Sequence, residues 1–246
     1  MREVSVVRPA GRKPGVPALL CVPGTMSDPV IFDGLAEATG TDVVVAPWLE
    51  WPGPHDMASL GAEVALLAER HAPVVLLGHS TGGVIALSAA LRTDRVRGVV
   101  VCDSGVNMRG HGDVDAIIDR VRAQWGPELW RAVARRSVHL PLPAEVAERL
   151  DSYPAALERD AVLVALRSQR DTDLAPRLAE LGRLPALVVH GRFDRARTLA
   201  HAQELADSLP GAELVVLECG HTPPVELPDR FAAELVRFLA GLPDGG

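Results

Sequence analysis

Lysine is almost absent from this sequence: among the 25 basic residues, Lys13 is the only lysine. An enzyme that uses pyridoxal phosphate needs a lysine for its Schiff base, and a P-loop needs a Gly-Lys-Ser/Thr run after its glycines. The chain has no such run, and Lys13 lies among Gly, Arg and Pro residues that are typical of a turn. Kinase, ATPase and pyridoxal phosphate functions are therefore excluded.

Basic clusters and long apolar runs are also missing. The formal net charge is −7, and no basic block could follow a phosphate backbone, so we expect neither nucleic acid nor a membrane surface as a partner. No apolar run is long enough to span a bilayer, and residues 1–4 do not look like the start of a secretory signal. The three cysteines, Cys21, Cys102 and Cys219, are an odd number, which argues against a disulfide framework. We expect a cytoplasmic protein.

The chain has the pattern of an α/β protein. Hydrophobic residues make up 48% and charged residues 23%, which is an ordinary globular balance. Short runs rich in Val, Leu and Ala alternate with segments of helical periodicity, so we predict a mostly parallel sheet with helices on both faces. The expected strands are 3–7, 18–22, 42–46, 74–77, 96–102, 186–190 and 214–217, and the expected helices are 29–38, 58–70, 83–91, 198–208 and 228–239.

One long segment interrupts this alternation. Residues 107–182 have helical periodicity broken by prolines but no convincing strand, with helices expected near 114–125, 128–136, 144–150 and 155–168. We interpret residues 1–246 as a single domain with a helical cap inserted at approximately 107–170.

Ser80 is the candidate nucleophile. It lies in the run Gly78-His79-Ser80-Thr81-Gly82, which follows a buried strand and precedes a helix. A serine on so tight a turn needs small neighbours, and a helix N-terminus favours the negative charge that develops during acyl transfer. A Gly-x-Ser-x-Gly run arises by chance in glycine-rich proteins, so its position after a strand carries the argument. The His79 side chain is expected to point away from the pocket and to pack.

At this point the chain resembles the α/β-hydrolase superfamily, in the branch with a serine nucleophile and a helical cap. That resemblance implies an acid after a later strand and a histidine after the last strand, in the chain order Ser, Asp, His. Asp194, in the run Gly191-Arg192-Phe193-Asp194, and His221, in the run Glu218-Cys219-Gly220-His221, fit these places. Asp103, which ends an earlier strand, is the competing acid, and we favour Asp194 because a carboxylate at the earlier place is more often structural.

The same resemblance implies an oxyanion hole made of two backbone N–H groups. One belongs to Thr81, which follows the nucleophile, and the other to the loop Pro23-Gly24-Thr25-Met26. Many relatives have His-Gly where this chain has Pro-Gly. The second donor is expected to be Thr25, with Met26 as the alternative.

Candidates for substrate contacts are less sharply defined. Loops after parallel strands surround the ligand crevice, so Met26, Trp48, Trp51, Asn107 and Trp125 are candidates, although packing explains the tryptophans equally well. The histidines lack His-x-x-x-His spacing and the cysteines lack Cys-x-x-Cys spacing, so we expect no metal and no cofactor.

We therefore expect a serine hydrolase that cleaves an ester, thioester or lactone bond of a small molecule through an acyl-enzyme. The same fold and residues also support a C–C bond hydrolase, a lyase, or a biosynthetic cyclase or transferase. A non-catalytic ligand receptor is a third class. The oligomeric state cannot be read from the sequence.

Overall fold

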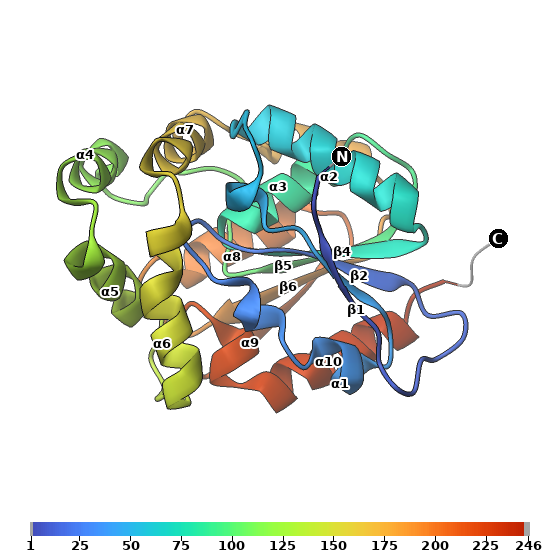
Figure 1. The fold of residues 1–246 in the computed structure, drawn as a ribbon. Helices are drawn as coiled ribbons and strands as arrows, with labels where there is room; N and C mark the ends of the chain where they lie inside the picture. Colours follow the sequence, from blue (N-terminus) through green and yellow to red (C-terminus); the bar gives the residue numbers. More distant parts are fainter. Residues whose placement is uncertain (1, 244–246) are drawn as a thin grey trace.

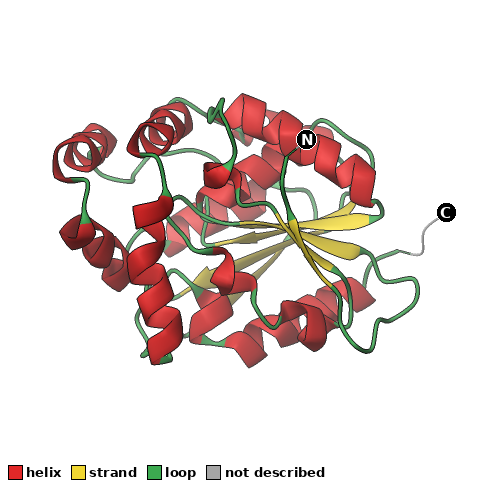
Figure 2. Cartoon of the chain, viewed as in Figure 1, coloured by secondary structure: helices red, strands yellow, loops and turns green. Residues whose placement is uncertain are grey.

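A twisted sheet forms the centre of the computed structural model, which describes residues 2–243 (Figures 1 and 2). Within these residues the sheet has seven strands in the order β1-β3-β2-β4-β5-β6-β7. The strand β1 pairs antiparallel with β3, and every other neighbouring pair is parallel, which confirms the predicted mostly parallel sheet. The strands are β1 Ser5–Val7, β2 Ala18–Val22, β3 Val43–Val45, β4 Val74–His79, β5 Val96–Cys102, β6 Ala186–Gly191 and β7 Glu213–Leu217.

Helices connect the strands and cover both faces of the sheet. The α-helices are α1 Leu35–Thr39, α2 Met57–His71, α3 Thr81–Ala90, α4 Val114–Gln124, α5 Pro127–Arg136, α6 Ala144–Ser152, α7 Arg159–Arg170, α8 Leu199–Ser208, α9 Pro223–Glu226 and α10 Pro228–Ala240. Short 3₁₀ helices are η1 Pro29–Phe32, η2 Trp48–Glu50, η3 Tyr153–Ala156 and η4 Ala175–Leu181. Among residues 2–243 we find no helix whose length and hydropathy suit a bilayer-spanning segment.

Successive strand residues point to opposite faces, which divides the core into two layers. Leu20 and Leu76 pack with α2, α3 and α8 on one face, whereas Leu19 and Leu77 pack with α1 and α10 on the other. Figure 1 shows α2 and α3 on one side of the sheet and α1 and α10 on the opposite side. Because both faces are covered, the central strands consist mainly of Val, Leu and Ala.

Four helices, α4 to α7, stand apart from these layers. They lie between β5 and β6 in the chain and gather at one end of the sheet in Figure 1. We call residues 107–170 the cap. The expected helix 155–168 is instead divided into η3 and α7, which begins at Arg159 after the break at Pro154.

Candidate active site

Ser80 lies on a sharp turn between the end of β4 and the start of α3. Its φ of 53° and ψ of −121° form a conformation that residues other than glycine rarely adopt, and such strain concentrates at functional sites. A Cβ atom at Gly78 would lie 2.3 Å from the carbonyl oxygen of Gly82, and one at Gly82 would lie 2.0 Å from the carbonyl oxygen of Val22. Any side chain at either position would therefore force this turn away from its neighbours.

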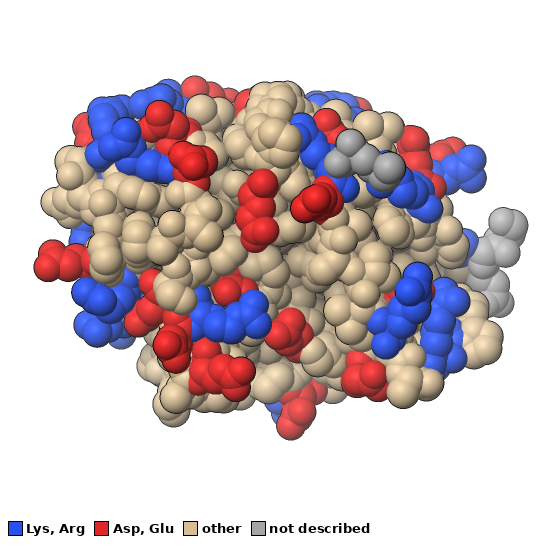
Figure 3. Space-filling model, in the orientation of Figure 1, with Lys and Arg blue, Asp and Glu red and all other residues tan. Residues whose placement is uncertain are grey.

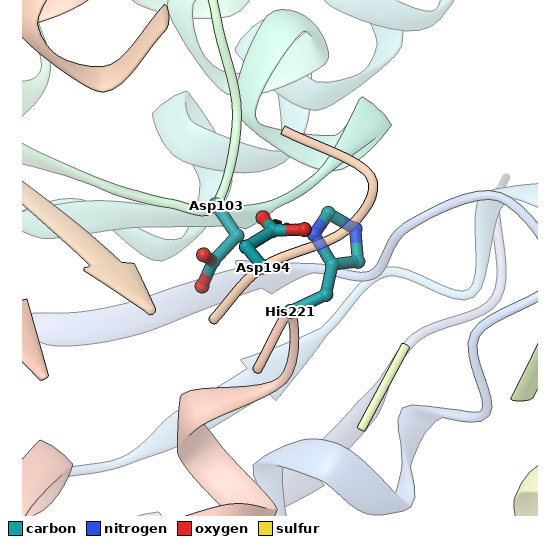
Figure 4. Close-up of side chains that lie close together, drawn as sticks. All are labelled: Asp103, Asp194 and His221. Carbon is teal, nitrogen blue, oxygen red and sulfur yellow. Dashed lines mark hydrogen bonds and ion pairs between the residues drawn. The ribbon is translucent and has the colours of Figure 1, made fainter. Parts of the chain in front are cut away.

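His221 and Asp194 meet in the loops that follow β7 and β6. The Nδ1 of His221 lies 2.7 Å from Oδ2 of Asp194, and this is the contact drawn as a dashed line in Figure 4. The other carboxylate oxygen, Oδ1, accepts hydrogen bonds from the backbone N–H groups of Ala196 at 2.6 Å and Arg197 at 2.9 Å. The carboxylate is therefore fixed from both sides.

The His221–Asp194 contact sets the protonation of both groups. Burial by itself would raise the pKa of Asp194, but the facing His221 and the backbone N–H donors lower it well below its ordinary value. Burial by itself would lower the pKa of His221, but the carboxylate of Asp194 outweighs it and raises that pKa above 6.5. An ionised Asp194 holds the proton of His221 at Nδ1, which leaves Nε2 free to act as a base.

Asp103 is the other carboxylate in this cluster, and its partners differ. Its Oδ1 accepts a hydrogen bond from the backbone N–H of Gly191 at 2.8 Å, and its Oδ2 accepts one from Sγ of Cys102 at 3.3 Å. Burial, followed by the charge of Asp194, raises the pKa of Asp103 well above its ordinary value. Figure 4 shows Asp103 beside Asp194 without a contact to His221. One carboxylate oxygen of each aspartate and one ring nitrogen of His221 lie within 4.8 Å of one another.

A cavity of about 260 Å³ adjoins Ser80 and His221. Its walls come from the turn at Ser80, the loop after β2, the loops after β6 and β7, and the cap. Lining side chains with apolar character include Met26, Met108, Val114, Val121, Leu129, Trp130, Val133 and Leu166. Within residues 2–243 no hydrogen bond joins the side chains of Ser80 and His221, although both residues line the cavity.

The loop after β2 approaches the Ser80 turn very closely. A Cβ atom at Gly24 would lie 2.9 Å from Cβ of Ser80, so only glycine fits there. Thr25 Oγ1 donates to Thr81 Oγ1 at 2.8 Å, and Thr81 Oγ1 donates to Oε1 of Gln169 at 2.9 Å. This chain of hydrogen bonds joins the two expected oxyanion donors to the cap helix α7. The alternative donor, Met26, has a φ of 62° and also lines the cavity.

His79 is buried, and its ring packs against the ring of His221 with centroids 5.0 Å apart. Its Nε2 lies 2.7 Å from the backbone carbonyl oxygen of His221. Burial, followed by the charge of His221, lowers the pKa of His79 to about 3, so its ring is neutral and Nε2–H is the donor. The residue before Ser80 therefore holds the backbone of the histidine loop.

Glu226 is a buried carboxylate that the sequence did not single out. Its Oε2 accepts from the backbone N–H groups of His139 at 2.7 Å, Leu140 at 2.8 Å and Gly220 at 3.0 Å. Its Oε1 accepts from the N–H of Thr222 at 3.1 Å. One side chain thus ties both neighbours of His221 to the segment between α5 and α6. The run Pro223-Pro224-Val225-Glu226 contains its only sequence signal, an acid placed five residues after the histidine.

The backbone of the cap also contacts the histidine loop directly. The carbonyl oxygen of Ser137 accepts from the N–H of His221 at 3.0 Å and from Oγ1 of Thr222 at 3.0 Å. Together with the bonds of Glu226, these contacts attach residues 137–140 to the loop that presents His221.

Trp48 and Trp51 do not lie at the cavity, so their proposed substrate contacts are corrected. Trp48 is fully buried, and its indole N–H donates to the carbonyl oxygen of Pro23 at 2.8 Å. The indole N–H of Trp51 donates to the carbonyl oxygen of Glu3 at 2.7 Å. Each indole N–H donates to a backbone carbonyl of this chain, which satisfies its polar atom without a ligand. Trp48 instead supports the loop that carries Thr25.

Asn107 and Trp125 also lie outside the cavity lining. Asn107 is buried, with Nδ2 donating to Glu204 at 3.2 Å and Oδ1 accepting from the backbone of Arg109 at 2.9 Å. Trp125 packs edge-on against Trp130, with ring centroids 5.6 Å apart. Trp130 lines the cavity in its place.

Comparisons with known proteins concern the family and the fold of the chain. A family described as the alpha/beta hydrolase family matches residues 19–234. A pimeloyl-[acyl-carrier protein] methyl ester esterase of Stenotrophomonas maltophilia is 33% identical over 199 residues, which cover 74% of this chain and 76% of that protein. An esterase from Exiguobacterium antarcticum has a similar fold, with a TM-score of 0.84 at 17% identity over 97% of this chain and 95% of that one. A hydrolase from Pseudomonas aeruginosa has a TM-score of 0.81 at 24% identity over 97% and 94% of the two chains.

Proposed function

Since the chain belongs to the alpha/beta hydrolase family, we propose that it hydrolyses an ester bond with Ser80 as nucleophile, His221 as general base and Asp194 as the acid that orients His221. The observation that carries the proposal is the 2.7 Å contact between His221 and Asp194 beside the cavity that Ser80 lines. A strained serine, a histidine with Nε2 free and a buried carboxylate behind it are the parts that acyl transfer requires.

The first half of the reaction forms an acyl-enzyme. Nε2 of His221 takes the proton from Oγ of Ser80 as that oxygen attacks the ester carbonyl carbon. The resulting oxyanion accepts hydrogen bonds from the backbone N–H groups of Thr81 and Thr25. His221 then gives its proton to the leaving alkoxide, and the alcohol departs while the acyl group stays on Ser80.

The second half returns the enzyme to its starting state. His221 takes a proton from water as the water oxygen attacks the acyl carbon, and the tetrahedral intermediate again places its charge in the oxyanion hole. The intermediate collapses, Oγ of Ser80 recovers its proton from His221, and the carboxylic acid leaves. Asp194 remains ionised throughout and stabilises the imidazolium form of His221.

The relatives named as methyl ester esterases favour an ester over the C–C hydrolase, lyase and cyclase alternatives. The mainly apolar walls that the cap contributes fit an acyl chain, and thioesters and lactones follow the same chemistry.

A labelling experiment tests the proposal. A fluorophosphonate probe should label the wild type and Ser208→Ala, whose serine lies on α8, but not Ser80→Ala. A panel of 4-nitrophenyl esters of increasing chain length should show turnover that Ser80→Ala lowers by at least about 10³-fold. Wild-type turnover by Ser80→Ala would disprove the nucleophile assignment, and labelling without ester turnover would favour a lyase or cyclase.

A further inference from the structure

The charged side chains that line the cavity have one sign. The sequence contains 32 acidic and 25 basic residues, and Figure 3 shows both kinds interspersed over the face in view. The described residues that line the cavity include Arg120, Arg136 and Arg197 but no Asp or Glu. A cavity with this lining attracts anions even though the whole chain carries a net negative charge.

Arg197 is the buried member of this set. Only 3% of its surface is exposed, and its neighbours at hydrogen-bond distance are uncharged. Nη1 donates to the carbonyl oxygen of Asn107 at 3.0 Å and to Nε2 of His111, and Nη2 contacts Sδ of Met108 at 3.2 Å. Within residues 2–243 no carboxylate forms an ion pair with its guanidinium. Burying an unpaired cation is costly, so a partner from outside the chain is the simplest reason for its retention.

The guanidinium keeps its charge at neutral pH. Burial lowers the pKa of Arg197 to about 10, which still leaves it protonated, and the charge of Asp194 opposes this shift. Burial, followed by the charge of Arg197, lowers the pKa of His111 to about 3, so that ring is neutral. One buried positive charge is thus present, and no group at hydrogen-bond distance of the guanidinium carries a negative charge.

Arg197 is also attached to the proposed catalytic acid. Its backbone N–H donates to Oδ1 of Asp194 at 2.9 Å, while Oδ2 of the same carboxylate contacts His221. Met108 and His111, which contact the guanidinium, line the cavity as well. A group bound by Arg197 would therefore be held in a fixed position relative to His221.

We infer that Arg197 binds a carboxylate of the substrate, so that the ester hydrolysed here carries a second, ionised carboxyl group. This inference rests on the proposed esterase function. A guanidinium presents parallel N–H donors that match the two oxygens of a carboxylate. A single buried cation balances one negative charge, whereas a doubly charged phosphate would need two. Arg120 and Arg136, which lack acidic partners within residues 2–243, add attraction along the cavity wall.

The first test uses the wild type alone. Mono-4-nitrophenyl esters of adipic, pimelic and suberic acid are compared with neutral esters in which an isopropyl group replaces the free carboxylate. The best hemiester should exceed its neutral partner in kcat/KM by roughly 10- to 100-fold, mainly through KM, because a hydrogen-bonded charge pair contributes on that scale. Equal turnover of every pair, or preference for the neutral esters, would overturn the inference. A larger preference for a phosphono ester would overturn the assignment to a carboxylate.

The second test uses matched variants. Arg197→Met should bring the ratio of kcat/KM for the two esters close to one, whereas Arg122→Met should retain the wild-type ratio. Arg122 lies on α4 of the cap, is exposed and pairs with Asp119. If Arg197→Met lowers both values equally and keeps the ratio, the residue has only a structural role.

A binding measurement separates failure of this inference from failure of the esterase proposal. At low salt, adipate or pimelate should raise the Tm of the wild type and of Arg122→Met but not of Arg197→Met. A rise in Tm without any ester turnover would support the anion site and contradict the esterase proposal. Turnover of neutral esters without a rise in Tm, and without a preference for the hemiesters, would support the esterase proposal and contradict the anion site.

Discussion

The Nε2 of His79 donates a hydrogen bond of 2.7 Å to the backbone carbonyl oxygen of His221. The residue beside the proposed nucleophile thus supports the backbone of the proposed base. Because Ser80 and His221 follow different strands, β4 and β7, this bond joins two loops that are far apart in the sequence.

Replacing His79 should therefore lower both stability and turnover. In His79→Leu the carbonyl oxygen of His221 would lose its buried donor, which costs about 1–3 kcal/mol. The free energy of unfolding in urea should fall by that amount, and kcat should fall because His221 is less well held. His79→Gln, which can donate from its amide, should recover part of both. Unchanged stability and kcat in His79→Leu would show that the bond has no role.

Glu226→Gln should be strongly destabilising. The amide nitrogen would replace one carboxylate oxygen, and no orientation of the amide gives acceptors to all four backbone N–H groups. A loss of roughly 3 kcal/mol in the free energy of unfolding is expected, because hydrogen bonds to charged groups are involved. Glu218→Gln, an exposed change on the same loop, is the control. Equal effects of the two substitutions would contradict the role given to Glu226.

The pH dependence of turnover should report the His221–Asp194 contact. Only the neutral form of His221 can accept the proton of Ser80, so kcat/KM for a neutral ester should fall as the pH drops through the pKa of His221. That pKa lies above 6.5, because Asp194 outweighs the lowering effect of burial. In Asp194→Asn the midpoint should move downward and kcat should fall by roughly 10³- to 10⁴-fold. An unchanged midpoint in this variant would mean that another group titrates.

Asp103→Asn should be tolerated, in contrast to Asp194→Asn. Burial, followed by the charge of Asp194, raises the pKa of Asp103, which favours its protonated form in the folded protein, and an uncharged amide is a close replacement for that form. The stability that a raised pKa contributes is fully present below the ordinary value of 3.8 and is lost as the pH rises through the folded value. At pH 7 the carboxyl group of Asp103 would be ionised in the unfolded chain. Replacing this group with an amide should therefore leave the free energy of unfolding unchanged or increase it.

Turnover distinguishes the two carboxylates. Asp103→Asn should keep kcat within a few-fold of the wild type while Asp194→Asn does not. A loss in Asp103→Asn as large as that in Asp194→Asn would restore Asp103 as a candidate for the catalytic acid.

Local patterns in the sequence were enough to predict the sheet and the position of Ser80. Buried parallel strands need apolar runs, and the Ser80 turn needs glycine at defined places, so both leave a signal over a few residues. Even so, β4 ends later than the predicted strand 74–77, because Gly78 and His79 continue to pair with β5 beyond the apolar run.

Other features depend on contacts between distant segments. No local pattern in the sequence predicts that the indole N–H of Trp48 donates to the carbonyl oxygen of Pro23, 25 residues away. Similarly, nothing near Arg197 in the chain indicates that Met108 and His111 surround its guanidinium. Such partners are determined by how the loops and the cap fold over the sheet, which short-range periodicity does not describe.

The bonds from Ser137, Glu226 and the histidine loop have a practical consequence for protein engineering. Residues 137–140 belong to the cap by position in the chain, but their hydrogen bonds attach them to the loop that carries His221, the proposed base. A chimera that imports a foreign cap to change specificity should therefore retain this short segment from the parent. The exchangeable part of the cap is in two pieces, one on each side of residues 137–140, and grafting it as one block would replace the support of His221 together with the walls of the cavity.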